Sequence, residues 1–366
     1  MFYNPAVRTL VVSLLAFAFF HSALVSQLGT TGVDANLRGV SVSKINGSQT
    51  STGKYAVWAS GTKGTVLRSL DEGKSWQQIK ISGAGDLDFR DIESFGAALA
   101  YAMSSGDGGK SRIYKTTDGG ESWTLQYTDK RAGFFLDSLA CDSTTHCFGL
   151  SDPVDGKFLI LSTGDGQHWT DLPRDKMPAA LPTEGAFAAS GTSIAVCNND
   201  VYFGTGGPAA RVFHSNDRGR SWAVFETPVV SGNASSGIFS IACHGRHLVA
   251  VGGDYRNPDR ATGVAAYSSD QGQTWHLADK QPGGYRSSVH IASGVAFAVG
   301  PKGEDSSPDY GANWKLTDNV NLNAAAPAPG GIVWAVGSGG TVKRFQLPVL
   351  DSSQRRGQPG NHDSSE

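Results

Sequence analysis

The chain has 366 residues, of which 47 are glycine, and a formal net charge of −2. A nucleic-acid-binding protein needs a clear basic excess, so this near-neutral charge argues against that class. Short runs rich in Val, Ile, Phe and Tyr are punctuated by Gly, Asp and Ser, and segments with a helical period are hard to find. This pattern predicts an all-β protein.

The N-terminal segment, residues 1–27, has the features of an export signal. Arg8 precedes the apolar run Thr9–Phe20, which is followed by more polar residues. This run is short for a membrane-spanning helix, which needs about 20 apolar residues. We therefore expect an exported protein, periplasmic or secreted, with an uncleaved N-terminal anchor as the alternative.

One eight-residue pattern, Ser/Thr-x-Asp-x-Gly-x-x-Trp, recurs along the chain, and we call it the Asp box. Its Asp can accept hydrogen bonds from turn amides, its Gly can adopt a positive φ, and its Trp can bury an indole between blades. A sixth copy, Ser162–Trp169, has Gly164 at the Asp position. The five complete boxes contain Asp71 and Trp76, Asp118 and Trp123, Asp217 and Trp222, Asp270 and Trp275, and Asp309 and Trp314.

Repeats about 40–50 residues apart are typical of a β-propeller, in which each repeat is one four-stranded blade. We expect each box to form the turn between the third and fourth strands of a blade. Its role there is structural.

Alignment of the repeats predicts a single seven-bladed propeller over residues 28–349, with six blades as the alternative. The seventh repeat contains a third strand, Gly340–Leu347, but neither a box nor a fourth strand. Residues Gln27–Val33 are expected to supply that strand, because closing the ring removes two exposed sheet edges. The innermost strands are predicted to begin near Leu37, Phe89, Phe135, Ala186, Ile238, Tyr285 and Leu322.

Four cysteines in an exported chain allow three full pairings. Cys141 and Cys147 flank a short loop, and Cys197 and Cys243 fall at similar heights on neighbouring blades of the alignment. We predict these two disulfides, with four buried or reduced thiols as the alternative. The polar residues 350–366 are predicted to form a disordered tail.

Three arginines occupy the same early position of three innermost strands: Arg38, Arg90 and Arg286. Innermost strands line the central channel, so we expect these side chains to converge on an anionic ligand, which arginine binds through two hydrogen bonds. The alternative is that each arginine pairs with a nearby acid and holds blades together. Acids available for such pairs are Asp91, Glu93, Asp137 and Glu184.

The loops between the second and third strands share the face opposite to the boxes, where we expect a site near the channel mouth. Loop residues expected to join the arginines there are Arg211, Tyr255 and Arg256. The acidic candidates on this face are Asp152, Asp155, Glu184 and Asp254. Glycoside hydrolysis needs two carboxyl groups at a defined separation, which a sequence does not provide, so no catalytic pair is assigned.

Neither a metal nor a cofactor is predicted. Cys243, His244 and His247 lie close together, but they fall in a turn on the box-bearing face and have no second cluster beside them. No phosphate-binding loop, dinucleotide fingerprint or Ser-His-Asp order is present.

Together with the boxes, the segments VWASGTKGTVLRSLDEGKSW, SRIYKTTDGGESWTLQ and VWAVGSGGTVKRF resemble bacterial propellers related to the photosystem II stability/assembly factor. The resemblance covers the chain after its N-terminal segment. It implies an exported, non-enzymatic, seven-bladed scaffold. It also implies a protein partner, such as a membrane or envelope complex, because the photosynthetic members assemble a membrane reaction centre and bind it through an arginine-rich surface.

A more distant similarity connects the boxes with sialidases. Phe89-Arg90-Asp91-Ile92 matches half of the Phe/Tyr-Arg-Ile-Pro motif of that family, but its Ile-Pro and its Tyr–Glu pair are missing. No catalytic residue is therefore carried over. The sequence predicts a monomeric propeller that binds a protein partner or an anionic ligand, and a glycan-active or glycan-binding propeller is the alternative.

Overall fold

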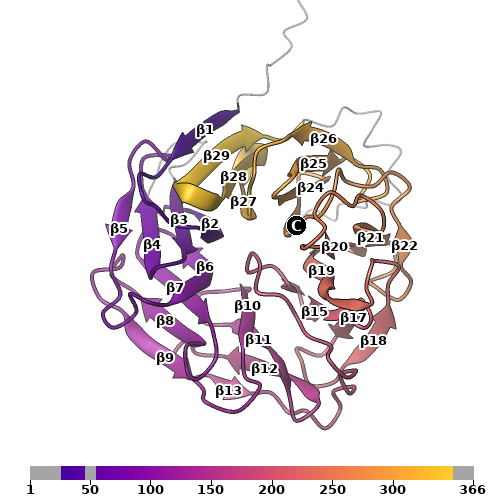
Figure 1. The fold of residues 1–366 in the computed structure, drawn as a ribbon. Coiled ribbons are helices and arrows are strands. Elements are labelled where there is room, and N and C mark those ends of the chain that lie inside the picture. Colours follow the sequence, from indigo (N-terminus) through magenta and orange to yellow (C-terminus); the bar gives the residue numbers. More distant parts are fainter. Residues whose placement is uncertain (1–25, 46–54, 349–366) are drawn as a thin grey trace, which may run out of the picture.

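The computed structural model describes residues 26–45 and 55–348. These residues form seven antiparallel sheets arranged in a ring, a single seven-bladed β-propeller (Figure 1). The predicted fold class and blade number are confirmed. The proposed export signal lies outside the described residues up to residue 25, and the proposed tail, residues 350–366, lies entirely outside them. In the described ranges, no helix has the length and apolar character needed to cross a membrane.

The first three blades each contain four consecutive strands, ordered from the channel to the rim. Blade 1 consists of β2 (Leu37–Lys44), β3 (Tyr55–Gly61), β4 (Thr65–Ser69) and β5 (Gln77–Ile79). Blade 2 consists of β6 (Asp88–Phe95), β7 (Leu99–Ser105), β8 (Arg112–Thr116) and β9 (Thr124–Thr128). Blade 3 consists of β10 (Leu136–Cys141), β11 (Cys147–Val154), β12 (Lys157–Thr163) and β13 (Thr170–Asp171).

The next three blades follow the same order, with one additional short strand in blade 5. Blade 4 consists of β14 (Ile194–Cys197), β15 (Asp200–Gly204), β17 (Arg211–Ser215) and β18 (Ala223–Glu226). Blade 5 consists of β16 (Gly206–Gly207), β19 (Asn233–His244), β20 (His247–Asp254), β21 (Ala265–Ser268) and β22 (His276–Leu277). Blade 6 consists of β23 (Ser288–Ala292), β24 (Val295–Gly300), β25 (Gly303–Ser307) and β26 (Lys315–Asp318).

The innermost strand of blade 4 departs from the prediction, because β14 begins at Ile194 rather than near Ala186. The amide of Ala186 donates a hydrogen bond to Oδ1 of Asp152 at 2.9 Å, a side chain of blade 3, instead of pairing with its own sheet. A side-chain acceptor of this kind competes with the sheet ladder. The segment before β14 is therefore irregular.

Blade 7 joins the two ends of the propeller. It combines β27 (Ala324–Ala328), β28 (Ile332–Val336) and β29 (Thr341–Gln346) with the N-terminal strand β1 (Gln27–Thr30), and short 3₁₀ turns occur at Pro329–Gly331 and Ser338–Gly340. β1 pairs antiparallel with β29, from Gln27 opposite Arg344 to Thr30 opposite Thr341. The expected closing strand is therefore present, and it begins at the last residue of the segment proposed as an export signal.

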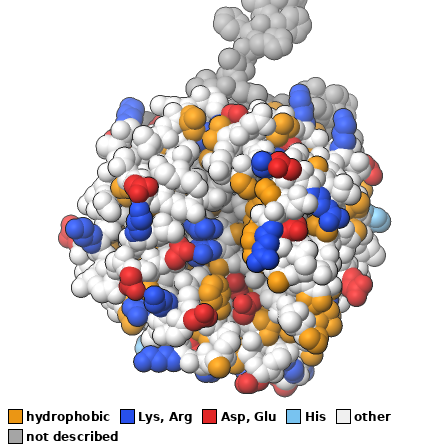
Figure 2. Space-filling view, in the orientation of Figure 1, with side chains coloured by type: hydrophobic (Ala, Val, Ile, Leu, Met, Phe, Trp, Pro, Cys, Tyr) orange, Lys and Arg blue, Asp and Glu red, His pale blue; other side chains and the backbone are white. Residues whose placement is uncertain are grey.

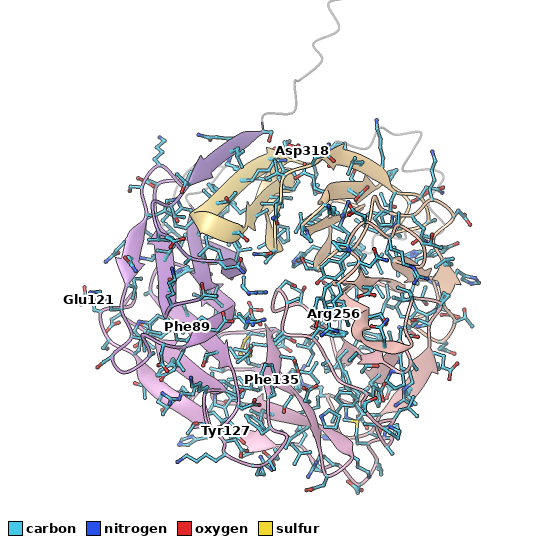
Figure 3. All side chains as sticks on the ribbon, in the orientation of Figure 1. Phe89, Glu121, Tyr127, Phe135, Arg256 and Asp318 are labelled. Atoms are coloured by element: carbon cyan, nitrogen blue, oxygen red, sulfur yellow. A yellow bond between two sulfur atoms is a disulfide. The ribbon has the colours of Figure 1, made fainter. Side chains whose placement is uncertain are left out.

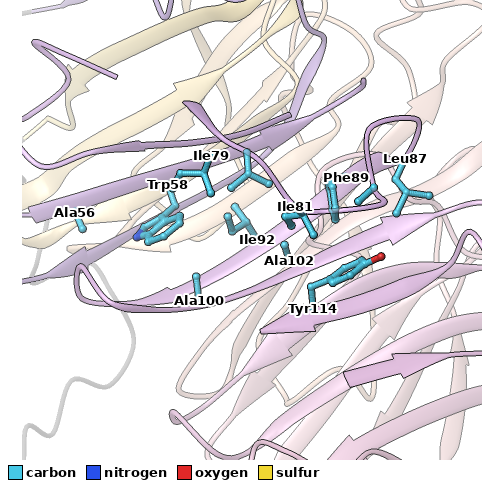
Figure 4. Packing of buried hydrophobic residues seen from close by; sticks show 12 residues of the cluster. Ala56, Trp58, Ile79, Ile81, Leu87, Phe89, Ile92, Ala100, Ala102 and Tyr114 are labelled. Atoms are coloured by element: carbon cyan, nitrogen blue, oxygen red, sulfur yellow. The ribbon is translucent and has the colours of Figure 1, made fainter. Parts of the chain in front are cut away.

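The hydrophobic core is divided into clusters that lie between neighbouring blades rather than at one centre. In the cluster between blades 1 and 2, Trp58 packs with Phe89, Ile92 and Tyr114 (Figure 4). Trp123, the last residue of an Asp box, meets Trp58 edge to face with ring centroids 6.3 Å apart. Each blade is thus held by both of its faces, and the box tryptophans contribute to these contacts.

The Asp boxes form hydrogen-bonded turns between the third and fourth strands. Oδ1 of Asp71 accepts from Ser69 Oγ at 2.9 Å and from the Ser75 amide at 2.9 Å, and Ser69 Oγ accepts from the Gly73 amide at 2.8 Å. The equivalent aspartates of the other four complete boxes accept the same set, namely Asp118, Asp217, Asp270 and Asp309.

The sixth box also has its carboxylate, one position later than the alignment placed it. Asp165 accepts from Thr163 Oγ1 at 3.2 Å and from the amides of Gln167 and His168, each at 2.8 Å. Gly164 is therefore not a replacement for the aspartate, because this turn is one residue shorter than the others.

Candidate functional site

A cavity of about 480 Å³ opens at the centre of the ring, on the face opposite to the Asp boxes. Four charged side chains line it: Arg38, Arg90, Asp137 and Asp152. Five aromatic side chains line it as well: Phe135, Phe187, Phe239, Tyr255 and Tyr285. We call this cavity the channel mouth. Figure 2 shows basic, acidic and hydrophobic side chains gathered around the hollow at the centre of this face.

β-Bulges in four innermost strands direct side chains into the channel mouth. The register of strand pairing shifts across one residue in β2, β6, β10 and β19. A bulge adds an unpaired residue and re-aims its side chain. The extra residues are Arg38, Arg90, Asp137 and Phe239, and all four line the mouth.

Arg38 is half-buried in the mouth and makes no hydrogen bond or ion pair with any described residue, and its Nε is buried. Burial, followed by the charge of Arg90, lowers the pKa of the Arg38 guanidinium. Arg90 differs, because its Nε donates to Asp88 at 2.6 Å and its Nη1 donates to the Ala188 carbonyl at 2.6 Å. The mouth therefore holds two neighbouring cations, of which Arg38 has its hydrogen-bonding capacity free.

The expectation that Arg286 converges with these two arginines is wrong. Its side chain is fully buried and ion-paired with Asp305, with Nε 2.7 Å from Oδ2, and its Nη1 donates to the Tyr285 carbonyl. The Arg286 amide bonds to Gly252 of the preceding blade, as the Leu37 amide bonds to Gly337. Arg286 thus occupies the buried position of Leu37, and a shift of one residue along a strand reverses the face of the side chain.

Arg211 and Glu184 also neutralise each other instead of facing a ligand. Arg211 Nε donates to Glu184 Oε1 at 2.8 Å, and its Nη2 reaches the second carboxylate oxygen and the Ala179 carbonyl. Thr205 Oγ1 donates to the same carboxylate at 2.6 Å. Both side chains are buried, so this pair matches the structural alternative considered for the arginines.

Aromatic rings from blades 4, 5 and 6 form one wall of the mouth. Phe187 and Phe239 stack with centroids 3.7 Å apart and an interplanar angle of 10°. Tyr285 and Tyr255 meet Phe239 edge-on at 4.8 Å and 6.2 Å. Tyr255 is 46% exposed, and the Arg256 guanidinium lies 5.8 Å from its ring centre. Figure 3 shows Arg256 and Phe135 beside the centre of the ring, with Glu121 and Asp318 at its edge.

The two carboxyl groups of the mouth, Asp137 and Asp152, are in unusual environments. Asp137 is buried, and neither of its oxygens has a hydrogen-bond partner among the described residues. Burial, then the charge of Asp152, raises the pKa of Asp137 well above its usual range. Burial likewise raises the pKa of Asp152 to about 6, although its Oδ1 accepts from the Ala186 amide.

The other two acidic candidates, Asp155 in the turn after β11 and Asp254 at the end of β20, do not line the mouth. Asp155 is exposed at a turn and has a φ of 53°. Asp254 accepts from Ser235 Oγ at 2.6 Å and from the Arg256 amide at 3.0 Å, which fixes the loop that carries Tyr255. Both residues therefore shape turns.

The opposite end of the channel has a different lining. A smaller cavity of about 240 Å³ is bordered there by Glu93, His290 and two disulfides, Cys141–Cys147 and Cys197–Cys243. Burial raises the pKa of Glu93 to about 8 and lowers the pKa of His290 to about 4, so both side chains favour their neutral forms. Cys243 is bonded to Cys197 and is not available as a thiolate ligand for a metal.

Sequence reasoning missed Phe187, Phe239 and Tyr285 and considered Asp137 only as a partner for arginine. A better signal for the mouth residues was the position that directly follows one buried apolar residue of each of these innermost strands. After Leu37, Phe89, Leu136 and Ile238 the residue at this position is the one at the bulge.

The family model for the DUF6242 beta propeller domain matches residues 50–338. The chain belongs to this family. A search of curated proteins finds no significant match. The propeller of this DUF6242 family member is similar to solved structures of other propellers.

A structure of YCF48 bound to D1 peptide has a TM-score of 0.62 and 12% identity, covering 88% of this chain and 97% of that chain. YCF48 from Cyanidioschyzon merolae has a TM-score of 0.59 and 14% identity, covering 87% and 98%. Virginiamycin B lyase from Staphylococcus aureus has a TM-score of 0.61 and 11% identity, covering 89% and 100%. At these identities the likeness shows the fold, and it confirms the resemblance to propellers related to the photosystem II assembly factor.

Proposed function

We propose that this DUF6242 propeller is an exported, non-enzymatic scaffold that binds a segment of a protein partner at the channel mouth. The observation that carries the proposal is Arg38, whose guanidinium lies in the open cavity without a partner among the described residues. A carboxylate of the partner would accept two hydrogen bonds from it and compensate its burial.

Two further features support a peptide as the ligand. The aromatic wall offers apolar surface for side chains, and the cavity volume lies in the range of sites that enclose a small ligand. The structurally similar YCF48 has been solved with a bound peptide, although 12% identity gives no correspondence between individual residues.

The proposal is tested by site-specific photo-crosslinking in envelope extract. A benzoylphenylalanine at Tyr255 samples the mouth, and one at Leu125 on the outer strand β9 is the matched control, since both native residues are 46% exposed. We expect a defined partner to crosslink to position 255 only and to be lost when Arg38→Ala is added. Arg220→Ala, in an exposed Asp-box turn, should leave the crosslink intact. Equal labelling from positions 255 and 125 would refute a binding role for the mouth.

A second candidate function, glycoside hydrolysis, is favoured by one observation: Asp137 and Asp152 both line the mouth, and their pKa values are raised. A glycosidase uses a protonated and an ionised carboxyl group together. A panel of glycosides tests this candidate, and turnover that disappears in Asp137→Asn would replace the scaffold proposal.

A further inference from the structure

Asp137 carries a buried carboxyl group in the channel mouth. It is the extra residue at the bulge of β10 and is 1% exposed. Neither carboxyl oxygen has a hydrogen-bond partner among the described residues, although the side chain borders an open cavity. A buried polar group left without a partner destabilises a fold, so this carboxyl group is suited to accept from a ligand.

Arg90, the cation whose charge acts on Asp137, already has hydrogen-bond partners. Arg90 donates to Asp88 and to the Ala188 carbonyl, each at 2.6 Å. The second carboxyl group, that of Asp152, adds negative charge beside Asp137 and uses one oxygen for the Ala186 amide. This side of the mouth therefore has two acids and no cation committed to Asp137.

The wall beside these acids is aromatic, with the stacked pair Phe187 and Phe239 followed by Tyr255. A guanidinium group suits such surroundings, since it stacks on aromatic faces and donates two parallel hydrogen bonds to a carboxylate. An ammonium group is a compact, strongly hydrated charge and gains less from the same wall.

We propose that Asp137, supported by Asp152, binds the guanidinium of an arginine side chain in the partner segment, so that the mouth recognises a peptide carrying an arginine near a carboxylate. The arginine lies on the Asp137 side, and the carboxylate lies on the Arg38 side. This inference rests on the proposed function, because it specifies the ligand of the same cavity. It adds the requirement that the partner segment carry a cation, whereas a surface of arginines alone would require only an anionic group.

The test uses two free amino acids of nearly the same shape as probes. L-Arginine carries a guanidinium where L-citrulline carries a neutral urea group, and both have the same carboxylate. Titration calorimetry of the full chain should give an affinity for arginine about tenfold or more above that for citrulline, as expected for a charge-assisted hydrogen bond. In Asp137→Asn, which keeps the size of the side chain, the ratio should fall close to one.

Arg38→Ala separates this inference from the proposed function. It should weaken both probes and keep the ratio between them, because it removes the partner of the shared carboxylate. If Arg38→Ala does not affect partner crosslinking, the proposed function fails, and the arginine-to-citrulline ratio still reports on Asp137. Equal binding of the two probes, no binding of arginine, or a preference that survives in Asp137→Asn overturns the inference.

The pH dependence of wild-type binding provides a second readout if Asp137→Asn does not fold. The charged groups facing Asp137 are Asp152 from β11 and Arg90 from β6, and Arg38 from β2 lines the same cavity. Arginine affinity should rise with pH as the carboxyl groups ionise, whereas citrulline affinity should change much less. Parallel pH profiles for the two probes would contradict the inference.

Discussion

The aspartates at the rim and those at the channel mouth of the same propeller differ in how they are satisfied. In an Asp box, Asp270 accepts hydrogen bonds from Ser268 Oγ and from the amides of Gln273 and Thr274. In the mouth, Asp137 has two buried oxygens without a partner among the described residues. At the rim, each box carboxylate is hydrogen-bonded within its own turn, and this arrangement recurs from blade to blade. In the mouth, the carboxyl oxygens of Asp137 have no partner among the described residues, and the arrangement does not recur. The comparison separates residues that build the ring from residues available to a ligand.

The largest expected effect comes from arginines that the sequence alignment treated as equivalent. Arg286→Ala leaves the buried Asp305 carboxylate without its partner, so we expect a loss of about 3–5 kcal/mol in the free energy of unfolding. Arg38→Ala removes no hydrogen bond to a described residue and should leave stability nearly unchanged. Urea denaturation of both variants checks this difference.

A double variant sharpens this prediction. Arg286→Met combined with Asp305→Leu removes both charges, so it should recover much of the loss. If Arg286→Ala and Arg38→Ala proved equally stable, the assignment of Arg286 to a structural role would be wrong.

The next largest expected effect is a loss of folding stability in acid, caused by protonation of the Asp-box carboxylates. Hydrogen bonds from the Ser75 side chain and amide lower the pKa of Asp71 to about 2, and the pKa values of Asp217 and Asp270 are also lowered to about 2. A folded pKa below the unfolded value of 3.8 stabilises the fold above about pH 4 and loses that stabilisation as pH falls toward 2. Urea midpoints measured across this range should decline, and Asp71→Asn should reduce the slope. A flat profile would mean that the box carboxylates do not stabilise the fold.

A single box gives a smaller effect. Asp270→Ala removes the acceptor of the buried Ser268 hydroxyl and of two turn amides, so we expect a loss of about 1–2 kcal/mol. Gln273→Ala, at an exposed position of the same turn, is the control and should change stability little. Thermal unfolding of the two variants measures the difference, and equal melting temperatures would argue against a stabilising box.

The propeller fold could be predicted from the sequence because the motifs that indicate it are short and recur along the chain. The box tryptophans mark a turn in each of the first six blades, and the missing fourth strand of the last repeat pointed to Gln27–Val33 as its replacement. Local reasoning was less accurate where spacing varied, since Gly164 hid the role of Asp165 in a turn one residue shorter.

The site was less predictable because it depends on which residue of each innermost strand forms the bulge. Arg286 stands at a position that is apolar in other blades, and its buried partner Asp305 lies on β25, so an alignment of Tyr285 with Phe89 does not reveal the ion pair. The shift of one residue changed its predicted environment from an open mouth to a closed ion pair. The contribution of Phe187 depends on the irregular segment before β14, which follows no repeat pattern.

The smallest expected effect has the opposite sign to that of the rim. Asp152 has a pKa of about 6 in the folded protein against 3.8 in the unfolded chain, so the folded state binds more protons between these values and its stability falls as pH rises from about 4 to 6. Asp152→Asn keeps an oxygen acceptor for the Ala186 amide and removes the titration, so it should flatten this decline and be more stable than the wild type at neutral pH. Asp155→Asn, in the exposed turn that follows β11, is the control and should keep the wild-type profile. Chemical denaturation across this pH range compares the three proteins. A decline that persists in Asp152→Asn would assign it to another buried acid, either Asp137 in the mouth or Glu93 at the opposite end of the channel, and would contradict the role given to Asp152.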